Sequence, residues 1–521
     1  MILGDFTRAA GAPSPGYGRI TLDDLFRRAA ARRPGAIALA DPPNRQAFTD
    51  GQPLRLSYAE ADRMVSAIAG RLRRIGLPTD AVVGIQMPNI VEHILTLLGV
   101  LRAGLIAAPL PQLWRRADAV TALARVGARA LIACGRVGNF EPCLQATQVA
   151  AEVFSIRHVC GFGDKLPDGV VGLDDLFAAA KLDPIPSLDR GGNAAAHLAV
   201  TTFEVGEDGP LPVARRHLEL LAGGVSTFLE GRLEQDASLL SAVPPASFAG
   251  LCLTLVPWLL AGGTLALHHP FDADVFARQR RNERAATLIL PAAVAFRLAE
   301  TGLFAREGPT TVLAAWHAPE RIMAVETDWP ERDAALVDVA IFGEIGFVAA
   351  RRGSGGRPVP LKPSAVAGDG ENAVTIAELA KSDSGTLALR GPLTPRAAFP
   401  PGIERSDQPH LRIGRDGFVD TGFPCRIDPL HQTVTVTGPP SGIVSVGAYR
   451  FPLCTLLAAI GRIDAAAAVA ALPDASTGQR LVGTAADLAA MQAALAALGA
   501  NPLVTAAFGE RGAQVRREAV A

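Results

Sequence analysis

Residues that could act as metal ligands or nucleophiles are few in this chain, and their spacing points to no shared site. The nine histidines and six cysteines include no H-E-x-x-H motif and no C-x-x-C pair, so the sequence predicts no metal site. The cysteines stand in apolar runs, which predicts buried free thiols in a reducing cytoplasm. Cys252, Ser247 and His217 could take part in nucleophilic catalysis, but no triad spacing connects them. Core or loop positions explain each of them more simply.

The composition is that of an ordinary globular protein with more than one domain. The chain has 521 residues, of which 49% are hydrophobic and 19% charged, and its formal net charge is −1. This balance offers no electrostatic footprint for nucleic acid. The apolar run from Ile94 to Leu110 is interrupted by Arg102 and is shorter than the roughly 18 residues that a membrane span needs. The start of the sequence has no apolar signal-peptide core. We therefore expect a cytoplasmic protein without a membrane span.

Apolar periodicity in the first 300 residues predicts strands that alternate with helices. Thr21 is a plausible N-cap for the first helix. The sequence predicts a strand pair at 37–40 and 54–58, helices at 58–75, 89–103 and 117–126, and strands at 81–87, 105–110 and 130–134. A comparable pattern returns at 213–300. This alternation favours α/β architecture with largely parallel sheets.

The last third of the chain has a different character. Short strands at 385–390, 417–421 and 433–437 predict a small antiparallel or barrel-like sheet. The Gly438-Pro-Pro-Ser-Gly run is the best domain boundary. Beyond it we expect a strand at 442–446 and Ala-rich helices around 453–471 and 484–498. The predicted domains are therefore 1–437 and 438–521.

Five segments, in this order and spacing, carry a family resemblance. They are LSYAEAD at 56–62, DAVVGIQMPN at 80–89, LLGVLRAGLIAAPL at 97–110, WLLAGGTLAL at 258–267 and TLILPAAV at 287–294. Together they resemble the adenylate-forming superfamily of acyl-CoA synthetases, adenylation domains and luciferases. The resemblance implies a large N-terminal domain with two α/β sheet subdomains and a small barrel-like sheet, followed by a small α+β C-terminal domain. It also implies two-step chemistry: a carboxylate attacks ATP, and a thiol such as that of CoA then displaces AMP.

The stretch that matches the family's phosphate loop has lost most of the loop's donors. The family writes T-S-G-T-T-G-x-P-K-G-V followed by a T-H pair, whereas residues 201–217 here are TTFEVGEDGPLPVARRH. Thr201, Thr202 and Gly206 fall at positions of this loop. Phe203, Glu204 and Leu211 stand where the family has a glycine, a threonine and the lysine, and two residues are inserted.

Three carboxylates now occupy this stretch: Glu204, Glu207 and Asp208. Like charges about 4 Å apart cost roughly 4 kcal/mol at an effective dielectric near 20, which is comparable to what a phosphate clamp would contribute. We therefore expect a solvated acidic loop rather than an ATP site.

The positions that match the acyl and adenine motifs are also altered. PPASFAG at 244–250 places Ser247 where the family has a gating His or aromatic residue, with Phe248 and Gly250 beside it as a candidate acyl pocket. AWHAPE at 315–320 places Trp316 and His317 where the family keeps glycines. These two side chains could fill the base pocket; alternatively, Trp316 could stack on another planar ligand.

The metal and ribose motifs show similar losses. The family's Y-G-x-T-E motif matches Phe342, Gly343, Glu344, Ile345 and Gly346, so that Ile345 replaces the threonine and Gly346 the Mg²⁺-associated glutamate. Glu344 is out of register as a ligand. The family's T-G-D motif matches Thr421, Gly422 and Phe423, and a phenyl ring cannot accept the ribose hydrogen bonds that a carboxylate accepts.

The hinge and the catalytic lysine are the last two differences. Pro439 follows Gly438 where the family has a basic hinge residue, and proline restricts backbone rotation. GAQVR at 512–516 matches the family's lysine-bearing ending and places Ala513 at the lysine. The chain has no lysine after Lys381.

Three functions stay open from these residues. The first is a non-catalytic homologue, with no catalytic residues, that binds an acyl group, an acyl-CoA or a partner synthetase or carrier protein, within fatty acid metabolism. The second is an active acid–CoA or acid–carrier ligase with unusual nucleotide contacts. The third is thioester transfer or hydrolysis in the acyl pocket. No cofactor is expected for the first; ATP, Mg²⁺ and CoA would serve the second.

Overall fold

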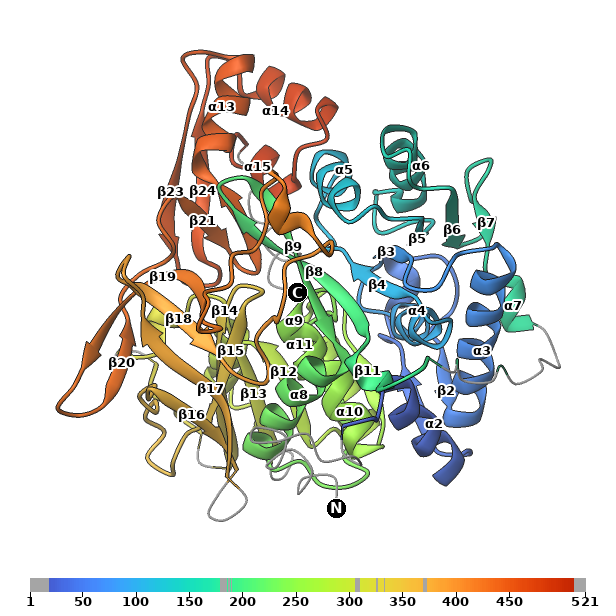
Figure 1. Ribbon diagram of the computed structural model, residues 1–521, viewed down its shortest axis with the longest axis horizontal. Coiled ribbons are helices and arrows are strands. Elements are labelled where there is room, and N and C mark those ends of the chain that lie inside the picture. The colour runs from blue at the N-terminus through green and yellow to red at the C-terminus, as the bar shows by residue number, and fades with distance from the viewer. Residues whose placement is uncertain are drawn as a thin grey trace.

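Two large sheets with covering helices form the body of the molecule in this computed structural model (Figure 1). The structure describes residues 18–178, 185, 188, 190–304, 310–324, 327–331, 333–368 and 373–509. Two smaller sheets follow in the C-terminal third. The predicted α/β fold class is confirmed, and every strand of the fourth sheet lies beyond residue 442. The domain boundary at 437/438 stays a prediction.

The first large sheet has seven strands in the order β7-β6-β5-β3-β4-β8-β9. Its strands are parallel except for the β8–β9 pair. The interior strand β5 is buried along its whole length, as expected for a parallel strand covered on both faces. The strands are β3 Val82–Gln86, β4 Ile106–Pro109, β5 Ala130–Cys134, β6 His158–Phe162, β7 Val171–Gly172, β8 Leu198–Gly206 and β9 Gly209–Arg216; the helices are α3 Tyr58–Arg74, α4 Val91–Arg102, α5 Arg116–Arg125, α6 Pro142–Glu152 and α7 Asp175–Ala178.

The second large sheet has eight strands in the order β15-β14-β13-β12-β10-β11-β1-β2. The predicted β1–β2 hairpin is confirmed as an antiparallel pair. The strands are β1 Ile37–Ala40, β2 Arg55–Ser57, β10 Leu239–Ser241, β11 Leu265–Leu267, β12 Thr287–Pro291, β13 Thr310–Trp316, β14 Ala334–Phe342 and β15 Gly346–Arg351; the helices are α2 Leu22–Arg32, α8 His217–Gly231, α9 Phe248–Gly250, α10 Val256–Ala261, α11 Ala273–Glu283 and α12 Ala292–Glu300.

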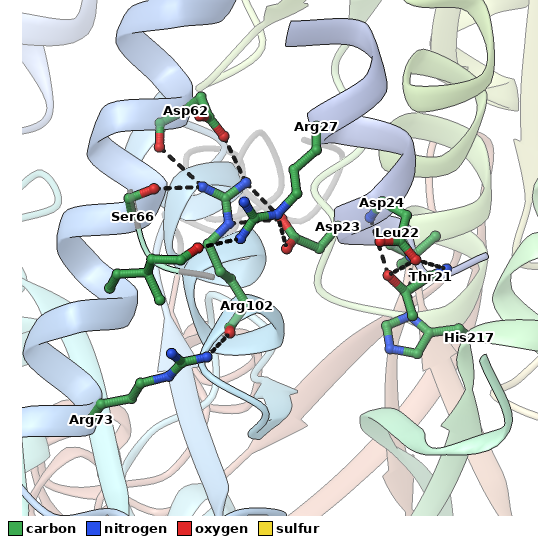
Figure 2. A network of polar contacts seen from close by, with 11 residues as sticks. Thr21, Leu22, Asp23, Asp24, Arg27, Asp62, Ser66, Arg73, Arg102 and His217 are labelled. Atoms are coloured by element: carbon green, nitrogen blue, oxygen red, sulfur yellow. Dashed lines mark hydrogen bonds and ion pairs between the residues drawn. The ribbon is translucent and has the colours of Figure 1, made fainter. Parts of the chain in front are cut away.

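A buried polar network joins helices α2, α3 and α4 (Figure 2). Arg102, the last residue of α4, donates through Nε and Nη2 to Asp23 at 2.9 and 2.7 Å and through Nη1 to Ser66 at 2.8 Å. Its guanidinium also pairs with Asp62 at 2.7 Å. The Arg102 side chain is fully buried, so these partners offset the cost of removing its charge from water.

A third sheet is antiparallel and has the order β16-β17-β18-β19-β20. A bridge between Leu361, just before β16, and Val434 of β20 brings its two ends together, in keeping with the predicted barrel-like sheet. Its strands are β16 Ser364–Ala367, β17 Val374–Lys381, β18 Thr386–Arg390, β19 Val419–Asp428 and β20 Thr433–Val436.

The fourth sheet and three helices form the C-terminal part, coloured orange and red in Figure 1. The predicted helix at 453–471 is wrong in its second half, because Ala468–Asp474 pairs with β24 as an edge strand. The elements are β21 Ile443–Val446, β22 Tyr449–Pro452, α13 Leu453–Ile463, β23 Ala468–Asp474, β24 Gly478–Thr484, α14 Leu488–Ala497 and α15 Pro502–Ala506.

Candidate functional site

A cavity of about 150 Å³ lies between the second large sheet, the β8–β9 hairpin and the C-terminal sheet. We call it the interdomain cavity. Trp114, Phe203 and Trp316 contribute aromatic surface to it, and Glu204, Glu344, Arg321 and Arg450 contribute charge. Its lining residues come from 111–114, 203–205, 242–247, 291–293, 315–321, 341–344, 447–450 and 476–478.

The candidate acyl side of this cavity is built on the loop after β10. Ser247 is the N-cap of α9, and its Oγ accepts the Gly250 N–H at 3.0 Å. Gly250 is required here, because an added Cβ would lie 2.2 Å from the carbonyl oxygen of Pro244. Ser247 lines the cavity, whereas Phe248 is fully buried behind it and packs on Phe347 with ring centroids 5.6 Å apart. Of the three predicted acyl-pocket residues, only Ser247 therefore faces the cavity.

The stretch that matches the phosphate loop is a regular hairpin. Strands β8 and β9 pair from Leu198↔Arg216 to Gly206↔Gly209, and only Glu207 and Asp208 connect them. Successive N–H groups of an extended strand point in opposite directions, so they cannot converge on one phosphate as the turns of an anion-binding nest do. Thr201 and Thr202 are buried within β8. The paired part of this stretch therefore does not form an anion-binding nest.

Glu204 is not part of a solvated loop, which corrects that prediction; only Glu207 and Asp208 are exposed at the turn. The Glu204 carboxylate forms an ion pair with Arg450 of β22, and the two side chains are 13% and 11% exposed. It also accepts the Glu344 N–H at 2.5 Å. A carboxylate thus stands at the matched phosphate position, and its counter-ion comes from the C-terminal sheet.

Gly343 allows this ion pair to approach the backbone. Its φ is +59°, and an added Cβ would lie 2.0 Å from Glu204 Oε2 and 2.5 Å from Arg450 Nη1. The left-handed conformation and the close contact both require glycine. The next residue, Glu344, accepts the Phe248 N–H at 2.7 Å, and burial raises the pKa of its carboxyl group.

Arg215 holds the same loop from the other side. Its Nη2 donates to the carbonyl oxygens of Glu344 and Ile345 at 2.5 and 2.9 Å, and its guanidinium stacks 3.7 Å from the centre of the Phe248 ring. The side chain is 2% exposed, and burial lowers its pKa to about 10. The segment that matches the family's metal motif is therefore fixed by protein contacts.

The metal-motif positions themselves face the core. Ile345 is buried, and Gly346 begins β15, where an added Cβ would lie 2.8 Å from Leu393 and 3.2 Å from Leu389. Neither position lines the cavity. No cluster of three or more His, Cys, Asp or Glu side chains suited to a metal occurs among the described residues.

The ribose position is filled by packed aromatic rings. Phe423 is 1% exposed; its ring lies 5.7 Å from that of Phe342 and 5.1 Å below the Arg450 guanidinium. Thr421 is buried and donates to the Leu387 carbonyl oxygen at 2.7 Å. Phe423 therefore belongs to the packing beneath the Glu204–Arg450 pair.

The adenine-side position holds two further bulky side chains. Trp316 is buried, packs edge-on against Phe296 and donates through Nε1 to Asp338 at 2.8 Å. His317 lines the cavity, and burial together with the nearby Arg450 charge lowers its pKa to about 4, so its ring is neutral at pH 7. Trp316 has structural partners on the side away from the cavity.

The C-terminal part is attached to both walls of the cavity. Tyr449 Oη accepts the Leu113 N–H at 3.2 Å, and Arg297 donates to Ser476 at 3.1 Å. Arg321 donates through Nη1 to the carbonyl oxygens of Asp474 and Ala475, both at 3.3 Å. The hinge residue Pro439 is exposed. Leu211 is half-buried in β9 opposite Glu204, and Ala513 lies outside the described residues.

The three possible nucleophile-site residues do not form a relay. Cys252 is fully buried, its Sγ donates to the Leu220 carbonyl oxygen at 3.5 Å, and burial raises the pKa of its thiol. His217 accepts the Leu22 N–H through Nδ1 at 3.2 Å (Figure 2), and burial lowers its pKa to about 4. Ser247 caps a helix. All six cysteines are free, and all except the exposed Cys454 are buried.

Three charged residues of the cavity were missed by sequence reasoning: Arg450, Arg321 and, as a cavity-lining group, Glu344. Arg450 is 246 residues from Glu204, so no local pattern could join them. The one available signal for Glu344 was its place after Gly343, in the turn that follows β14. A side chain in such a turn can face a cavity beside the ends of the strands.

Comparisons with known proteins agree with this architecture. Residues 26–203 match the family model "AMP-binding enzyme". The chain is 29% identical over 288 residues to the 2-hydroxy-7-methoxy-5-methyl-1-naphthoate–CoA ligase of Streptomyces carzinostaticus, a match that covers 53% of this chain and 49% of the relative. It is 28% identical over 290 residues to the salicyl-AMP ligase/salicyl-S-ArCP synthetase of Mycobacterium tuberculosis, covering 55% and 49%. The chain thus spans about half the length of these relatives.

Solved structures share the fold over nearly the whole chain. The amide bond synthetase McbA from Marinactinospora thermotolerans superposes with a TM-score of 0.69 at 18% identity, covering 93% of this chain and 94% of that one. Apo MbtA of Mycobacterium smegmatis gives a TM-score of 0.62 at 23% identity, covering 96% and 94%. The family-model match at residues 26–203 and the sequence relatives support the predicted resemblance to the adenylate-forming (AMP-binding) superfamily.

The structure also bears on membrane insertion. Within the described part of the chain, no helix has both the length and the apolar character needed to cross a bilayer.

Proposed function

We propose that this chain is a non-catalytic member of its superfamily that binds a small acyl or aryl carboxylic acid, or the corresponding CoA thioester, without forming an adenylate. The observation that carries the proposal is the β8–β9 hairpin, in which the phosphate-loop positions are paired strands and Glu204 faces the cavity. Several transition-state donors are replaced at once, and losing a single such donor typically costs about 10²–10³ in rate.

The size of the interdomain cavity supports a ring-sized ligand. A cavity of 150 Å³ is known to hold a benzene ring, and about the same volume is present here. Trp114, Val243 and Pro244 give it apolar walls. This volume favours a short acyl or aryl group over a long fatty chain.

Arg321 is the best partner for the ligand's carboxylate. It lines the cavity, and among the described residues its Nη1 donates to the backbone carbonyl oxygens of Asp474 and Ala475. The other cavity cation, Arg450, is already neutralised by Glu204. A carboxylate bound to a guanidinium gains charge-assisted, geometrically matched hydrogen bonds. The bound protein would act by associating with a partner synthetase or carrier protein.

The test is stabilisation by an acid in the absence of ATP. Benzoate, salicylate and benzoyl-CoA are titrated while the melting temperature is measured, since a ligand that binds only the folded state raises it. We expect at least one of them to raise the melting temperature of the wild type. Arg321→Met should remove the effect, and Ala293→Phe, which fills the cavity, should remove it too. Arg297→Met is the control, because this arginine donates to Ser476 of the cavity wall but does not itself line the cavity. If no probe stabilises the protein, or if Arg321→Met responds like the wild type, the proposal is wrong.

An active acid–CoA or acid–carrier ligase is the alternative, favoured by the relatives whose names describe such activities. Pyrophosphate release with Mg²⁺–ATP and the same acids separates the two functions. Acid-dependent release that is lost in Arg321→Met would establish the ligase and refute the non-catalytic reading.

A further inference from the structure

A second cavity shares no lining residue with the first. Its volume is about 310 Å³, and we call it the strand-end cavity. It is formed where β3, β5 and β6 end: Glu92 follows β3, Gly135 follows β5, and Gly163 follows β6. Residues from 45–54 and from 174–177 close its sides.

This location is the one where open parallel sheets bind ligands. In the order β6-β5-β3-β4, the chain leaves β3 through α4 towards β4 and leaves β5 through α6 towards β6, on opposite sides. The neighbouring carboxyl ends of β3 and β5 therefore form a topological switch point, and ligands of doubly wound folds sit in the crevice outside such a point.

The charge of the strand-end cavity is predominantly negative. Four carboxylates line it, those of Asp50, Glu92, Asp164 and Asp174, together with one guanidinium, that of Arg45. Arg45 is already bound, through Nη1 to Asp41 at 2.5 Å and through Nη2 to Glu92 at 2.6 Å. Asp50 is paired with Arg136 at 2.9 Å. Asp164 and Asp174 have no ion-pair partner among the described residues, so the cavity carries net negative charge.

Glu92 provides an independent sign of a missing partner. The residue is 3% exposed; its Oε1 accepts from Arg45, whereas its Oε2 is buried and has no hydrogen-bond partner among the described residues. A buried carboxylate oxygen without a donor costs free energy. Glu92 lines the cavity, so a donor bound there could satisfy it.

The remaining walls suit an apolar or planar body. The rings of Phe162 and Phe177 stack with centroids 5.5 Å apart, and both residues line the cavity with Leu54 and Ile90. Aromatic faces attract organic cations. Gly135 and Gly163 make room for the Asp50 carboxylate, since an added Cβ would lie 3.2 and 3.1 Å from its Oδ2.

We propose that the strand-end cavity is a second ligand site, which binds an organic cation: an amine or guanidinium carried on an apolar or planar body. The ammonium or guanidinium donates to Glu92 and to the aspartates at the mouth, and the body lies against the two phenylalanine rings. The site is independent of the interdomain cavity and of the function proposed for it.

The test uses three probes of one shape and different charge: phenethylamine, 2-phenylethanol and phenylacetate. Binding to the full chain is followed by titration calorimetry and ligand-observed NMR. We expect saturable binding of the amine with a Kd below about 1 mM and binding of the alcohol and the acid weaker by about tenfold or more. Equal affinity for amine and alcohol, or no saturable binding of the amine, would show a solvent-filled crevice and overturn the proposal.

Variants assign the binding to this cavity. Glu92→Gln keeps an acceptor for Arg45 and should weaken amine binding about tenfold, because a carboxylate attracts a cation more strongly than a neutral amide. Asp174→Asn and Asp164→Asn, at exposed positions where misfolding is not expected, should each weaken it about threefold or more. Asp175→Asn is the matched control, since Asp175 pairs with Arg71 and does not line the cavity. Unchanged affinity in both Asp164→Asn and Asp174→Asn would refute the assignment, whatever the behaviour of Glu92→Gln.

Discussion

The two sides of the interdomain cavity differ in how their space is used. On the side formed by the loop after β10 and the start of α12, Ser247 and Ala293 leave open volume beside small side chains. On the side that matches the nucleotide site, Phe423 is packed under Arg450, which is paired with Glu204. Under the function proposed here, the comparison teaches that side chains and one regular hairpin can close a binding site locally while the surrounding sheets keep their architecture.

The largest expected effect comes from reopening the packed side at the ribose position. Phe423→Asp replaces a fully buried ring with a carboxylate and should lower the free energy of unfolding by about 3–5 kcal/mol. Urea denaturation measures this loss. Phe423→Leu, which keeps an apolar side chain, is the control and should lose about half as much or less. A stable Phe423→Asp protein that binds ATP would mean that the nucleotide site needs only this one group.

Breaking the Glu204–Arg450 pair should have the next largest effect. Arg450→Met leaves the mostly buried Glu204 carboxylate without its counter-ion and should lower the free energy of unfolding by about 3 kcal/mol. We also expect faster proteolysis at residues 438–442, because this pair helps to hold the C-terminal sheet in place. A double-mutant cycle with Glu204→Gln measures the coupling.

The exposed pair Arg390–Glu378 provides the matched control for this cycle. Its side chains are 39% and 46% exposed, and such surface pairs contribute about 0–1 kcal/mol. If Arg450→Met lowers the free energy of unfolding by no more than Arg390→Met does, the Glu204–Arg450 pair does not hold the C-terminal part in place.

A smaller effect is expected at Trp316, which lines the cavity but forms its hydrogen bond to Asp338 on the side away from the cavity. Trp316→Phe removes the donor to the buried Asp338 and should cost about 1–3 kcal/mol. Because the aromatic wall is kept, stabilisation by carboxylic acids should change little. Loss of acid binding with unchanged stability would instead identify Trp316 as a stacking surface for the ligand.

The smallest effect concerns Glu344 and pH. Burial raises the pKa of its carboxyl group above the ordinary value of 4.5. Between the pKa of the unfolded state and the raised pKa of the folded state, the folded protein binds more protons, so the free energy of unfolding falls as pH rises through this range. Glu344→Gln should therefore flatten this decline above about pH 4.5 and be slightly more stable than the wild type at pH 7. Melting temperatures measured from acid to neutral pH test this, and an unchanged slope in the variant would contradict it.

Much of the fold follows from local patterns, whereas the cavity does not. The buried run Ala130–Cys134 was predicted with its observed bounds, because a short apolar segment between helices has few alternatives. The segment 464–471 was predicted as helix from its alanines, yet Ala468 begins an edge strand, because pairing with β24 outweighs helix propensity. The positions that differ from the family motifs could be located in the sequence, but the contacts that these residues make in the fold could not.

Glu204 shows why. Its charge suggested a solvated loop, since an isolated carboxylate avoids burial. Burial is tolerated here because Arg450, from a distant strand, neutralises it and Gly343 gives it room. Both conditions depend on long-range docking, which no single-sequence pattern encodes.

The most direct test of the central claim is a calorimetric titration of Mg²⁺–ATP into the purified full-length protein. We expect no saturable binding up to about 1 mM, a limit that corresponds to about 4 kcal/mol of binding free energy, with or without a carboxylic acid present. Saturable binding in this range, accompanied by pyrophosphate release when an acid is added, would contradict the claim that the packed side of the cavity excludes the nucleotide.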